Sequence, residues 1–405
     1  MKLLRITSLY PTYIREFYRK NHGLSGKSYA EQKKILDFDA FGWSDYWLHA
    51  LSPLGYEVRE VRLNVEPLQR AWARENDLPD PASMKLEEIA FTQARRFEPE
   101  ILWFEDSSED LPKRIRSEIP SIRLVLGWAG SAIPRTDIWR RMDLVLSCAQ
   151  ESVEELQKAG YPTVQLHHGF DPRINGRLTD RPKKMDLSFI GQLMREEGFH
   201  RYRVQLLETI ASKIDIEIFS PSADFDWKDD GMAILKAGCY EVARMMKSVG
   251  LPASTIKALP ILGKAAQWPS RPALPANRKL KPFMKPPVFG LDMFQVLRDS
   301  KSTLNIHADS SPVFASNMRL FEATGVGTCL ITDWKRNLHH LFEPDKEIVV
   351  YKSAEELVDK AKWLLDHHRE CEEIASAGKK RTMKDHTYAQ RAEQLNVLIM
   401  DKLRK

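Results

Sequence analysis

The segment 316–327 carries the polar residues whose types and spacing say most about chemistry. It reads Ser-Asn-Met-Arg-Leu-Phe-Glu-Ala-Thr-Gly-Val-Gly and follows a loop of small residues at 308–316. Asn317 is the predicted N-cap of a helix, and Gly325 is its predicted left-handed end. Free amides at a helix N-terminus bind anions, and Glu322, deeper in the helix, offers a carboxylate to the two hydroxyls of a ribose. The segment predicts a nucleotide diphosphate site, although an ordinary strand–helix–strand crossover with a solvated Glu322 gives the same spacing.

Two further strand ends supply predicted contacts to the same ligand. Ser-Phe-Ile at 188–190 is followed by Gly191, which lets a backbone approach a ligand closely. Arg195 is a predicted partner for a diphosphate, with an ordinary surface arginine as the alternative. His307 ends a strand predicted at 303–307 and joins the set.

In the first half of the chain, acidic and imidazole side chains lie where they could face a cleft. Glu105 and Asp106 follow one predicted strand and His168 follows another, whereas Asp39 and Asp45 flank Phe-Gly-Trp at 41–43. Deprotonating a hydroxyl requires a carboxylate or imidazole within hydrogen-bond reach. Each carboxylate can also be a helix cap or a solvated charge, and the histidine can also be a buried, hydrogen-bonded ring, so all remain candidates. The candidate catalytic residues are Asp39, Asp45, Glu105, Asp106 and His168.

The sequence predicts neither a metal ion nor a cofactor. Asp224-Phe225-Asp226 matches the Asp-x-Asp pattern of metal-binding sites, but it lies in a turn-like stretch with no apolar framework to fix it. The four cysteines are widely spaced and form no CxxC pair, which argues against structural zinc. Cationic side chains and helix amides can stabilise a departing diphosphate without Mg²⁺.

These residues need a scaffold of alternating strands and helices. The first half shows short apolar runs separated by amphipathic stretches, which predicts a parallel sheet covered on both faces. The predicted strands are 3–8, 56–63, 101–104, 122–126, 143–147 and 163–166, and the predicted helices include 43–54, 86–96 and 149–159. Tyr10 and a basic loop (Arg15, Arg19, Lys20) are expected after the first strand.

After a polar connector at 171–184 the same pattern restarts. Predicted strands are 186–190, 216–220, 303–307 and 328–332, and predicted helices are 199–214, 232–249, 293–301, 317–324, 354–365, 367–377 and 389–403. We therefore expect an α/β chain of two Rossmann-like domains, at 1–175 and 185–386, with a final helix at 387–405. The N-terminus lacks the pattern of a signal peptide, and the expected location is the cytoplasm.

A basic, proline-rich insert at about 222–288 interrupts the second domain. Eight of the 23 prolines lie between Pro252 and Pro287, and segment 231–285 holds ten Lys or Arg against one acid, Glu241. This local charge of +9 indicates an anionic partner better than the whole-chain charge of +5 does. Three interpretations stay open: a solvated loop, a lid over an acidic or pyrophosphate-bearing acceptor, or contact with an anionic membrane surface.

The pattern Asn-x-Arg-x-Phe-Glu-Ala-x-Gly at 317–325, with Leu-Phe-Glu-Pro at 341–344 and Glu-Ile-Val-Val-Tyr at 347–351, resembles the C-terminal half of GT-B glycosyltransferases. It is most similar to their spore-maturation (CgeB-type) branch. The resemblance implies two Rossmann-like domains facing across a cleft, with a C-terminal helix that crosses back to the N-terminal domain. It also implies that helix amides hold the donor diphosphate and that Glu322 holds the ribose. The predicted donor-binding residues are Gly191, Arg195, His307, Ser316, Asn317, Arg319 and Glu322.

The sequence departs from many retaining relatives at position 314. Those enzymes have a second glutamate there, which contacts the donor sugar, whereas this chain has Phe314. Stereochemistry, sugar and nucleotide therefore stay open.

The expected function is transfer of a sugar from a nucleotide-sugar to a glycan, lipid-linked or other hydroxyl acceptor. An epimerase-like enzyme and a non-catalytic structural protein are the alternatives, since fold does not fix chemistry. Nucleic acid is not an expected partner, because the basic insert lacks interleaved aromatic residues.

Overall fold

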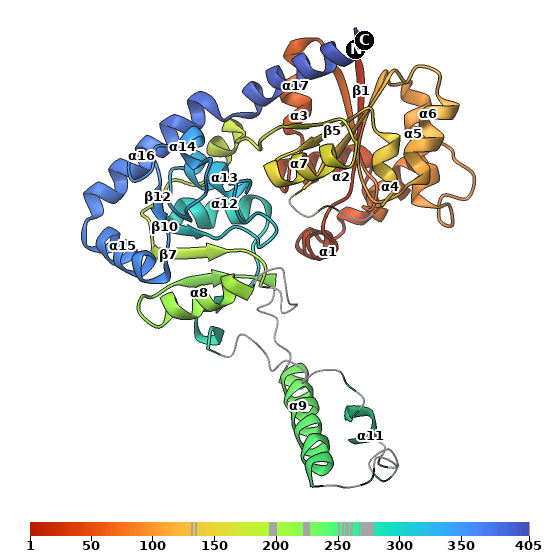
Figure 1. Ribbon diagram of the computed structural model, residues 1–405. Coiled ribbons are helices and arrows are strands. Elements are labelled where there is room, and N and C mark those ends of the chain that lie inside the picture. The colour runs from red at the N-terminus through yellow and green to blue at the C-terminus, as the bar shows by residue number, and fades with distance from the viewer. Residues whose placement is uncertain are drawn as a thin grey trace. The chain divides into compact units, whose positions relative to one another are not determined.

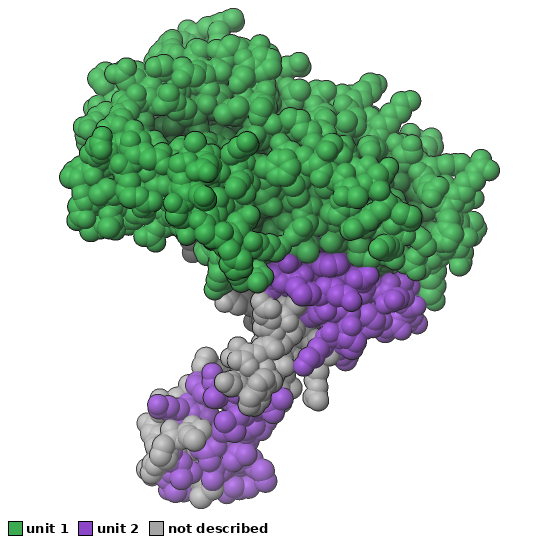
Figure 2. All heavy atoms as spheres, turned by 180° about the vertical axis from the view of Figure 1, so that it is seen from behind, with its two compact units in different colours: residues 1–188, 288–405 green, residues 189–287 purple. Residues whose placement is uncertain are grey.

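The computed structural model describes residues 1–130, 133, 136–193, 201–221, 227–249, 252, 255, 259, 262–266, 268 and 279–404. The chain divides into two compact units (Figure 2). Unit 1 comprises residues 1–188 and 288–405, and unit 2 comprises residues 189–287.

Unit 1 begins with a six-stranded sheet of order β2-β1-β3-β4-β5-β6, in which every neighbouring pair is parallel. Its strands are β1 (Lys2–Thr7), β2 (Glu57–Arg62), β3 (Ile101–Glu105), β4 (Leu124–Ala129), β5 (Leu144–Ser147) and β6 (Thr163–Gln165). The four residues of β5 are all buried, because helices cover both faces of the sheet (Figure 1). All six strands agree with the prediction to within a few residues.

The helices around this sheet include α1 (Pro11–Lys20), α2 (Tyr29–Phe38), α3 (Tyr46–Leu51), α4 (Glu66–Glu75), α5 (Leu86–Phe97), α6 (Asp110–Glu118) and α7 (Gln150–Lys158). Four of them, α1, α2, α4 and α6, are helices that the sequence interpretation did not name. The segment expected to be a basic loop after β1 is the helix α1, which begins at Pro11 and buries Tyr13 and Phe17. The expected loop was wrong because two aromatic anchors four residues apart are enough to hold a helix whose other face is charged.

The second sheet has the order β12-β11-β10-β7-β8-β9. Its strands are β7 (Met185–Ile190), β8 (Glu217–Phe219), β9 (Met284–Lys285), β10 (Ser300–Asn305), β11 (Cys329–Asp333) and β12 (Val349–Tyr351). The β10–β11, β11–β12 and β8–β9 pairs are parallel. The associated helices are α8 (Arg201–Ala211), α9 (Trp227–Ser248), α11 (Leu262–Ala265), α12 (Gly290–Asp299), α13 (Arg319–Val326), α14 (Leu338–Leu341), α15 (Ala354–Asp366) and α16 (His368–Asp385). The two parallel sheets with their helices confirm the α/β prediction.

The last helix, α17 (Tyr388–Leu403), returns to the first sheet and lies beside α3 (Figure 1). The Tyr388 ring lies 5.0 Å from Tyr46 and 5.3 Å from Trp47 between ring centroids. Farther along, the Tyr56 hydroxyl donates to Asn396 Oδ1 at 2.7 Å. The predicted crossover of the C-terminal helix is confirmed.

No helix in the described part of the chain is both long enough and apolar enough to span a membrane.

Candidate functional site

The loop that follows β10 leads into α13, whose first turn differs from the prediction. The helix begins at Arg319 and its N-cap is Met318, which makes no side-chain capping bond. The Asn317 side chain instead donates to Asn305 Oδ1 at 2.9 Å, which fixes the loop to β10. The predicted N-cap was therefore one residue early, and Asn317 ties the loop to the sheet.

The glycine that ends α13 is not the one that the spacing predicted. Gly327, with φ of 88°, is the left-handed residue that ends α13. Gly325 lies inside the helix, where a Cβ atom would come within 2.3 Å of the Phe170 ring. The predicted helix end at Gly325 was wrong, because that glycine is required by close packing.

Glu322 and Arg319 form an ion pair on the first turn of α13, with Arg319 Nη1 2.9 Å from Glu322 Oε2. Glu322 exposes only 8% of its surface. Its burial raises the pKa of the Glu322 carboxyl, and the charge of Arg319 partly offsets that effect. Arg319 also lies 3.1 Å from the sulfur of Met293 on α12. A carboxylate that is held in place by one guanidinium can still accept hydrogen bonds from hydroxyl groups, because it has two oxygens with several lone pairs.

His307 is buried just beyond β10 and faces β11. Its Nδ1 lies 2.7 Å from Asp333 Oδ1, and its backbone amide donates to the same oxygen. Burial opposes ionisation of Asp333, but the charge and hydrogen bonds of His307 and the charge of Lys335 outweigh it and lower the pKa of Asp333 to about 2. His307 Nε2 is buried with no hydrogen-bond partner within the described ranges. The structure thus fixes His307 by one ring nitrogen and leaves the other unused.

The rest of the loop is held from both sides. Ser316 is buried with its hydroxyl 3.0 Å from that of Ser311, and Asn337 Oδ1 accepts from the amide of Ala315 at 2.6 Å. From the first half of the chain, Glu151 Oε1 accepts from the amides of Val313 and Phe314 at 3.0 and 2.9 Å.

The sequence interpretation missed Glu151 entirely. An acidic residue in the first turn of a helix is ordinary, and α7 gives no local sign of a partner 162 positions away. The same carboxylate has a second oxygen, Oε2, that is buried and unpaired among the described residues.

The remaining predicted donor contacts belong to unit 2. Gly191 follows β7, and its amide donates to the Phe219 carbonyl at 3.1 Å. A Cβ atom at Gly191 would lie 2.9 Å from the end of the Phe189 ring, so a larger residue would require that ring to move. Arg195, Asp224 and Asp226 lie outside the described residues.

The five catalytic candidates lie in different surroundings, and two of them are held by arginines. Glu105 accepts two bonds from Arg5, both at 2.9 Å, and Arg5 also pairs with Glu60 at 2.8 Å. Asp45 pairs with Arg173 at 2.8 Å; burial raises the pKa of Asp45, but the Arg173 contacts and the nearby His49 outweigh it and lower that pKa. Both carboxylates already have cationic partners.

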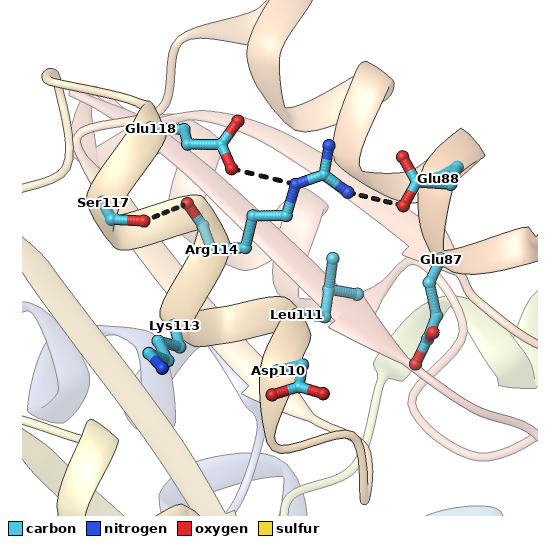
Figure 3. A pocket seen from close by; sticks show the side chains of 8 residues that line it. All are labelled: Glu87, Glu88, Asp110, Leu111, Lys113, Arg114, Ser117 and Glu118. Carbon is cyan, nitrogen blue, oxygen red and sulfur yellow. Dashed lines mark hydrogen bonds and ion pairs between the residues drawn. The ribbon is translucent and has the colours of Figure 1, made fainter.

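Asp45 lines a hollow of about 430 Å³ with His49, Arg173 and Arg177. A second hollow, between α5 and α6, contains Arg114 paired with Glu88 and Glu118 (Figure 3). None of the predicted site residues lines this second hollow.

His168 is buried, and its Nδ1 accepts from Trp43 Nε1 at 3.2 Å. Burial, together with the charges of His167 and Arg391, lowers the pKa of His168 to about 3, so the ring is neutral at pH 7. His168 therefore packs as an uncharged ring among tryptophans.

Asp39 and Asp106 are only partly buried. Asp106 follows β3, where its Oδ2 accepts from the Ser8 hydroxyl at 2.5 Å and its Oδ1 accepts from the Ser108 amide at 3.0 Å. Asp39 accepts from the Tyr13 hydroxyl at 2.8 Å. Burial raises the pKa of Asp39 to about 6, against the effect of the Tyr13 bond.

Asp39 also lies directly against the start of α12. Gly290 there has φ of 53°, and a Cβ atom on it would come within 2.3 Å of the Asp39 carboxylate.

Comparison with known proteins identifies the architecture. Residues 203–396 match a family model described as glycosyl transferase-like. No curated protein matches the chain.

Among solved structures, a sucrose-phosphate synthase from Thermosynechococcus elongatus has a TM-score of 0.54 at 10% identity, over 99% of this chain and 98% of its own. HepE of Anabaena in complex with UDP-glucose has a TM-score of 0.53 at 12% identity, over 99% and 100%. An alpha-glucosyltransferase in complex with UDP-glucose and DNA has a TM-score of 0.56 at 12% identity, over 100% of both chains.

These similarities cover both sheets and the crossover helix, and they establish the fold. The family match falls on the part of the chain that carries β10, α13 and the Arg319–Glu322 pair. The chain has the GT-B fold, and its residues 203–396 match the glycosyl transferase-like family model.

Proposed function

We propose that the chain transfers a sugar from a nucleotide-sugar to a hydroxyl group of a glycan, lipid-linked or other acceptor, without a metal ion or cofactor. The observation that carries the proposal is the buried Glu322, paired with Arg319 on the first turn of α13. In this position Glu322 accepts the hydroxyls of the ribose. Two of the neighbours have UDP-glucose bound, which makes a uridine nucleotide the first donor to test.

The proposed chemistry divides between the two halves of the chain. Amides near the start of α13 hold the diphosphate, and fixed dipoles of this kind stabilise the charge that develops on the departing nucleoside diphosphate. Asp106 is the proposed base. It is partly buried at the carboxyl end of a central strand, and among the described residues its hydrogen bonds come from neutral donors, the Ser8 hydroxyl and the Ser108 amide. Glu105, in contrast, is held by Arg5.

A thermal-shift screen of UDP, GDP, CMP and dTDP in EDTA tests the donor site. We expect one nucleotide to raise Tm, because a ligand at 100 times its Kd stabilises the folded state by about 2.7 kcal/mol. No shift with any nucleotide at millimolar concentration would contradict the donor site. A shift that requires Mg²⁺ or Mn²⁺ would contradict the metal-free proposal and point to Asp224 and Asp226.

A second experiment tests the base. With the nucleotide-sugar identified by that screen, Asp106→Asn is expected to abolish transfer while nucleotide binding is retained. Asp110→Asn, at the exposed start of α6, is the matched control and keeps its activity. Nucleotide binding with no sugar transfer by the wild type would favour an epimerase-like or non-catalytic protein.

The proposal includes contact between the basic insert and an anionic membrane surface. Its support is the local charge, ten cations against one acid at 231–285. The electrostatic attraction between this many cations and anionic lipids is enough to bring a protein to a membrane surface.

A further inference from the structure

Helix α9 of unit 2 exposes a continuous apolar stripe. Leu235, Gly238, Val242 and Met245 recur at alternating intervals of three and four residues, which places them on one face of the helix. Val249 directly follows the helix and continues this spacing, with its amide donating to the Met245 carbonyl at 3.1 Å. All five are exposed, and Met245 and Val249 each expose 68% of their surface. Ile234 is also exposed and borders the stripe.

The stripe points away from the neighbour of α9. Helix α11 packs on α9, and the two lie side by side in Figure 1. The buried residues of α9 are Ala237 and Ala243, which lie on the other half of the helix circumference. On that same half, Lys247 Nζ donates to the Ala266 carbonyl at the end of α11 at 2.7 Å. The apolar face is thus turned outward in the unit that contains it.

The charge of the helix and its segment indicates what can cover the stripe. Lys236, Arg244 and Lys247 are exposed on the half of α9 opposite the stripe, and Glu241 is the one acid of segment 231–285. The aliphatic stems of lysine and arginine can lie along an apolar boundary while their charges reach a polar layer. Two copies of so basic a segment would repel each other, whereas an anionic lipid surface attracts it.

We infer that α9 is a membrane-docking helix that lies in the interface of an anionic phospholipid bilayer with the stripe Leu235–Gly238–Val242–Met245–Val249 in the acyl boundary. A helix with one apolar face and cations on the opposite, polar face lies in the plane of the interface. The inference deepens the proposed function by assigning its membrane contact to a defined face. It is tested separately from that function, because vesicle binding needs neither donor nor acceptor.

The test is co-sedimentation of the full chain with vesicles of phosphatidylcholine containing about 30% phosphatidylglycerol, against vesicles of phosphatidylcholine alone. We expect binding to the anionic vesicles and at least about tenfold weaker binding to the neutral ones. The double variant V242D/M245D is expected to lower binding to anionic vesicles about tenfold or more, because it places two carboxylates in the apolar boundary. High salt weakens the wild-type interaction, since exposed charges are screened.

The control is Val397→Asp on α17, which makes the same kind of change at a residue that exposes 58% of its surface. This variant is expected to bind vesicles as the wild type does. Equal Tm and nucleotide response in all variants show that they remain folded. Equal binding to both kinds of vesicle, or undiminished binding by the double variant, overturns the inference. A dimer in solution that V242D/M245D dissociates also overturns it, in favour of self-association.

Discussion

The carboxylate of Glu151 on α7 accepts a hydrogen bond from the backbone amide of Phe314 at 2.9 Å, in the loop before α13. The same oxygen accepts from Val313, so one side chain of the first half of unit 1 holds two successive amides of the second half. Phe314 stands where the sequence resemblance implies a glutamate in many retaining enzymes, and in this chain a carboxylate from another helix, Glu151, accepts from its backbone amide.

We predict that Glu151→Ala lowers the free energy of unfolding by about 1–3 kcal/mol, because hydrogen bonds to a charged group are lost and two amides are left without their acceptor. Glu151→Gln retains one acceptor oxygen and should cost less. Urea denaturation measures both effects. Glu154→Ala, on the exposed side of the same helix, is the control and should be nearly neutral. If Glu151→Ala were as stable as that control, the contact would have no role in holding the loop.

Asp39 is expected to make stability depend on pH in an unusual direction. Its pKa is raised to about 6 in the folded chain, above the ordinary value of 3.8, so the folded state binds the proton more tightly. The contribution of Asp39 to stability is therefore present at low pH and is lost as pH rises from about 4 through about 6. Relative to Asp39→Asn, wild-type stability should fall over this window by at most about 3 kcal/mol. Urea denaturation of both proteins at several pH values tests this, and a constant difference would refute it.

Glu322→Gln is predicted to weaken nucleotide binding about 10–100-fold, because about 1.4 kcal/mol corresponds to each factor of ten and a hydrogen bond to a charged group contributes about 1.5–3 kcal/mol. Isothermal titration with the nucleotide found in the screen measures the change. A 2′,3′-dideoxy nucleotide should bind the wild type and the variant almost equally, since it lacks the hydroxyls. Glu372→Gln, exposed on α16, is the control. Normal nucleotide binding by a destabilised Glu322→Gln variant would make Glu322 a purely structural residue.

The crossover helix should contribute strongly to stability. Leu395 on α17 is fully buried, and Leu395→Ala is predicted to cost about 2–5 kcal/mol. Val397→Ala, two residues along the same helix but exposed, should change stability by less than about 0.5 kcal/mol. Denaturant titration of the two variants measures the contrast, and similar values would indicate that α17 does not pack on α3 in solution.

Truncation before Tyr388 provides a second readout of the crossover. Removal of α17 would expose Tyr46 and Trp47, so the truncated chain should aggregate in size-exclusion chromatography. A monodisperse truncated protein with unchanged melting would contradict this.

The strands and the crossover helix could be predicted from the sequence for a physical reason. A strand buried on both faces has to be an apolar run, as Leu-Val-Leu-Ser in β5 is, and such a run stands out between polar helices. Helix α1 could not be predicted in this way, because most of its residues are charged or polar and only Tyr13 and Phe17 are buried.

The details of the site could not be predicted from the sequence, because they depend on contacts between residues far apart in the chain. Gly325 and Gly327 are equally good helix terminators in the sequence, and packing against Phe170 assigns one of them to the helix interior. The bond from Glu151 to the Phe314 loop joins positions that no local pattern links. The assignment of roles to Glu322, Asp106 and the other site residues stays a prediction until the binding and transfer experiments are made.

Arg5, Glu60 and Glu105 lie on the three neighbouring strands β1, β2 and β3, with Arg5 directly opposite Glu60 in the parallel register. If β1 slipped by two residues against β2, Arg5 would face Val58 or Arg62, and Glu60 would lose Arg5 while keeping Arg62, 3.2 Å away on its own strand. Breaking a buried ion pair in this way costs about 3–5 kcal/mol, whereas the apolar residues around it would tolerate the slip. The charged trio therefore selects one alignment among several that hydrophobicity alone would accept, and it makes misaligned copies of this sheet too unstable to accumulate.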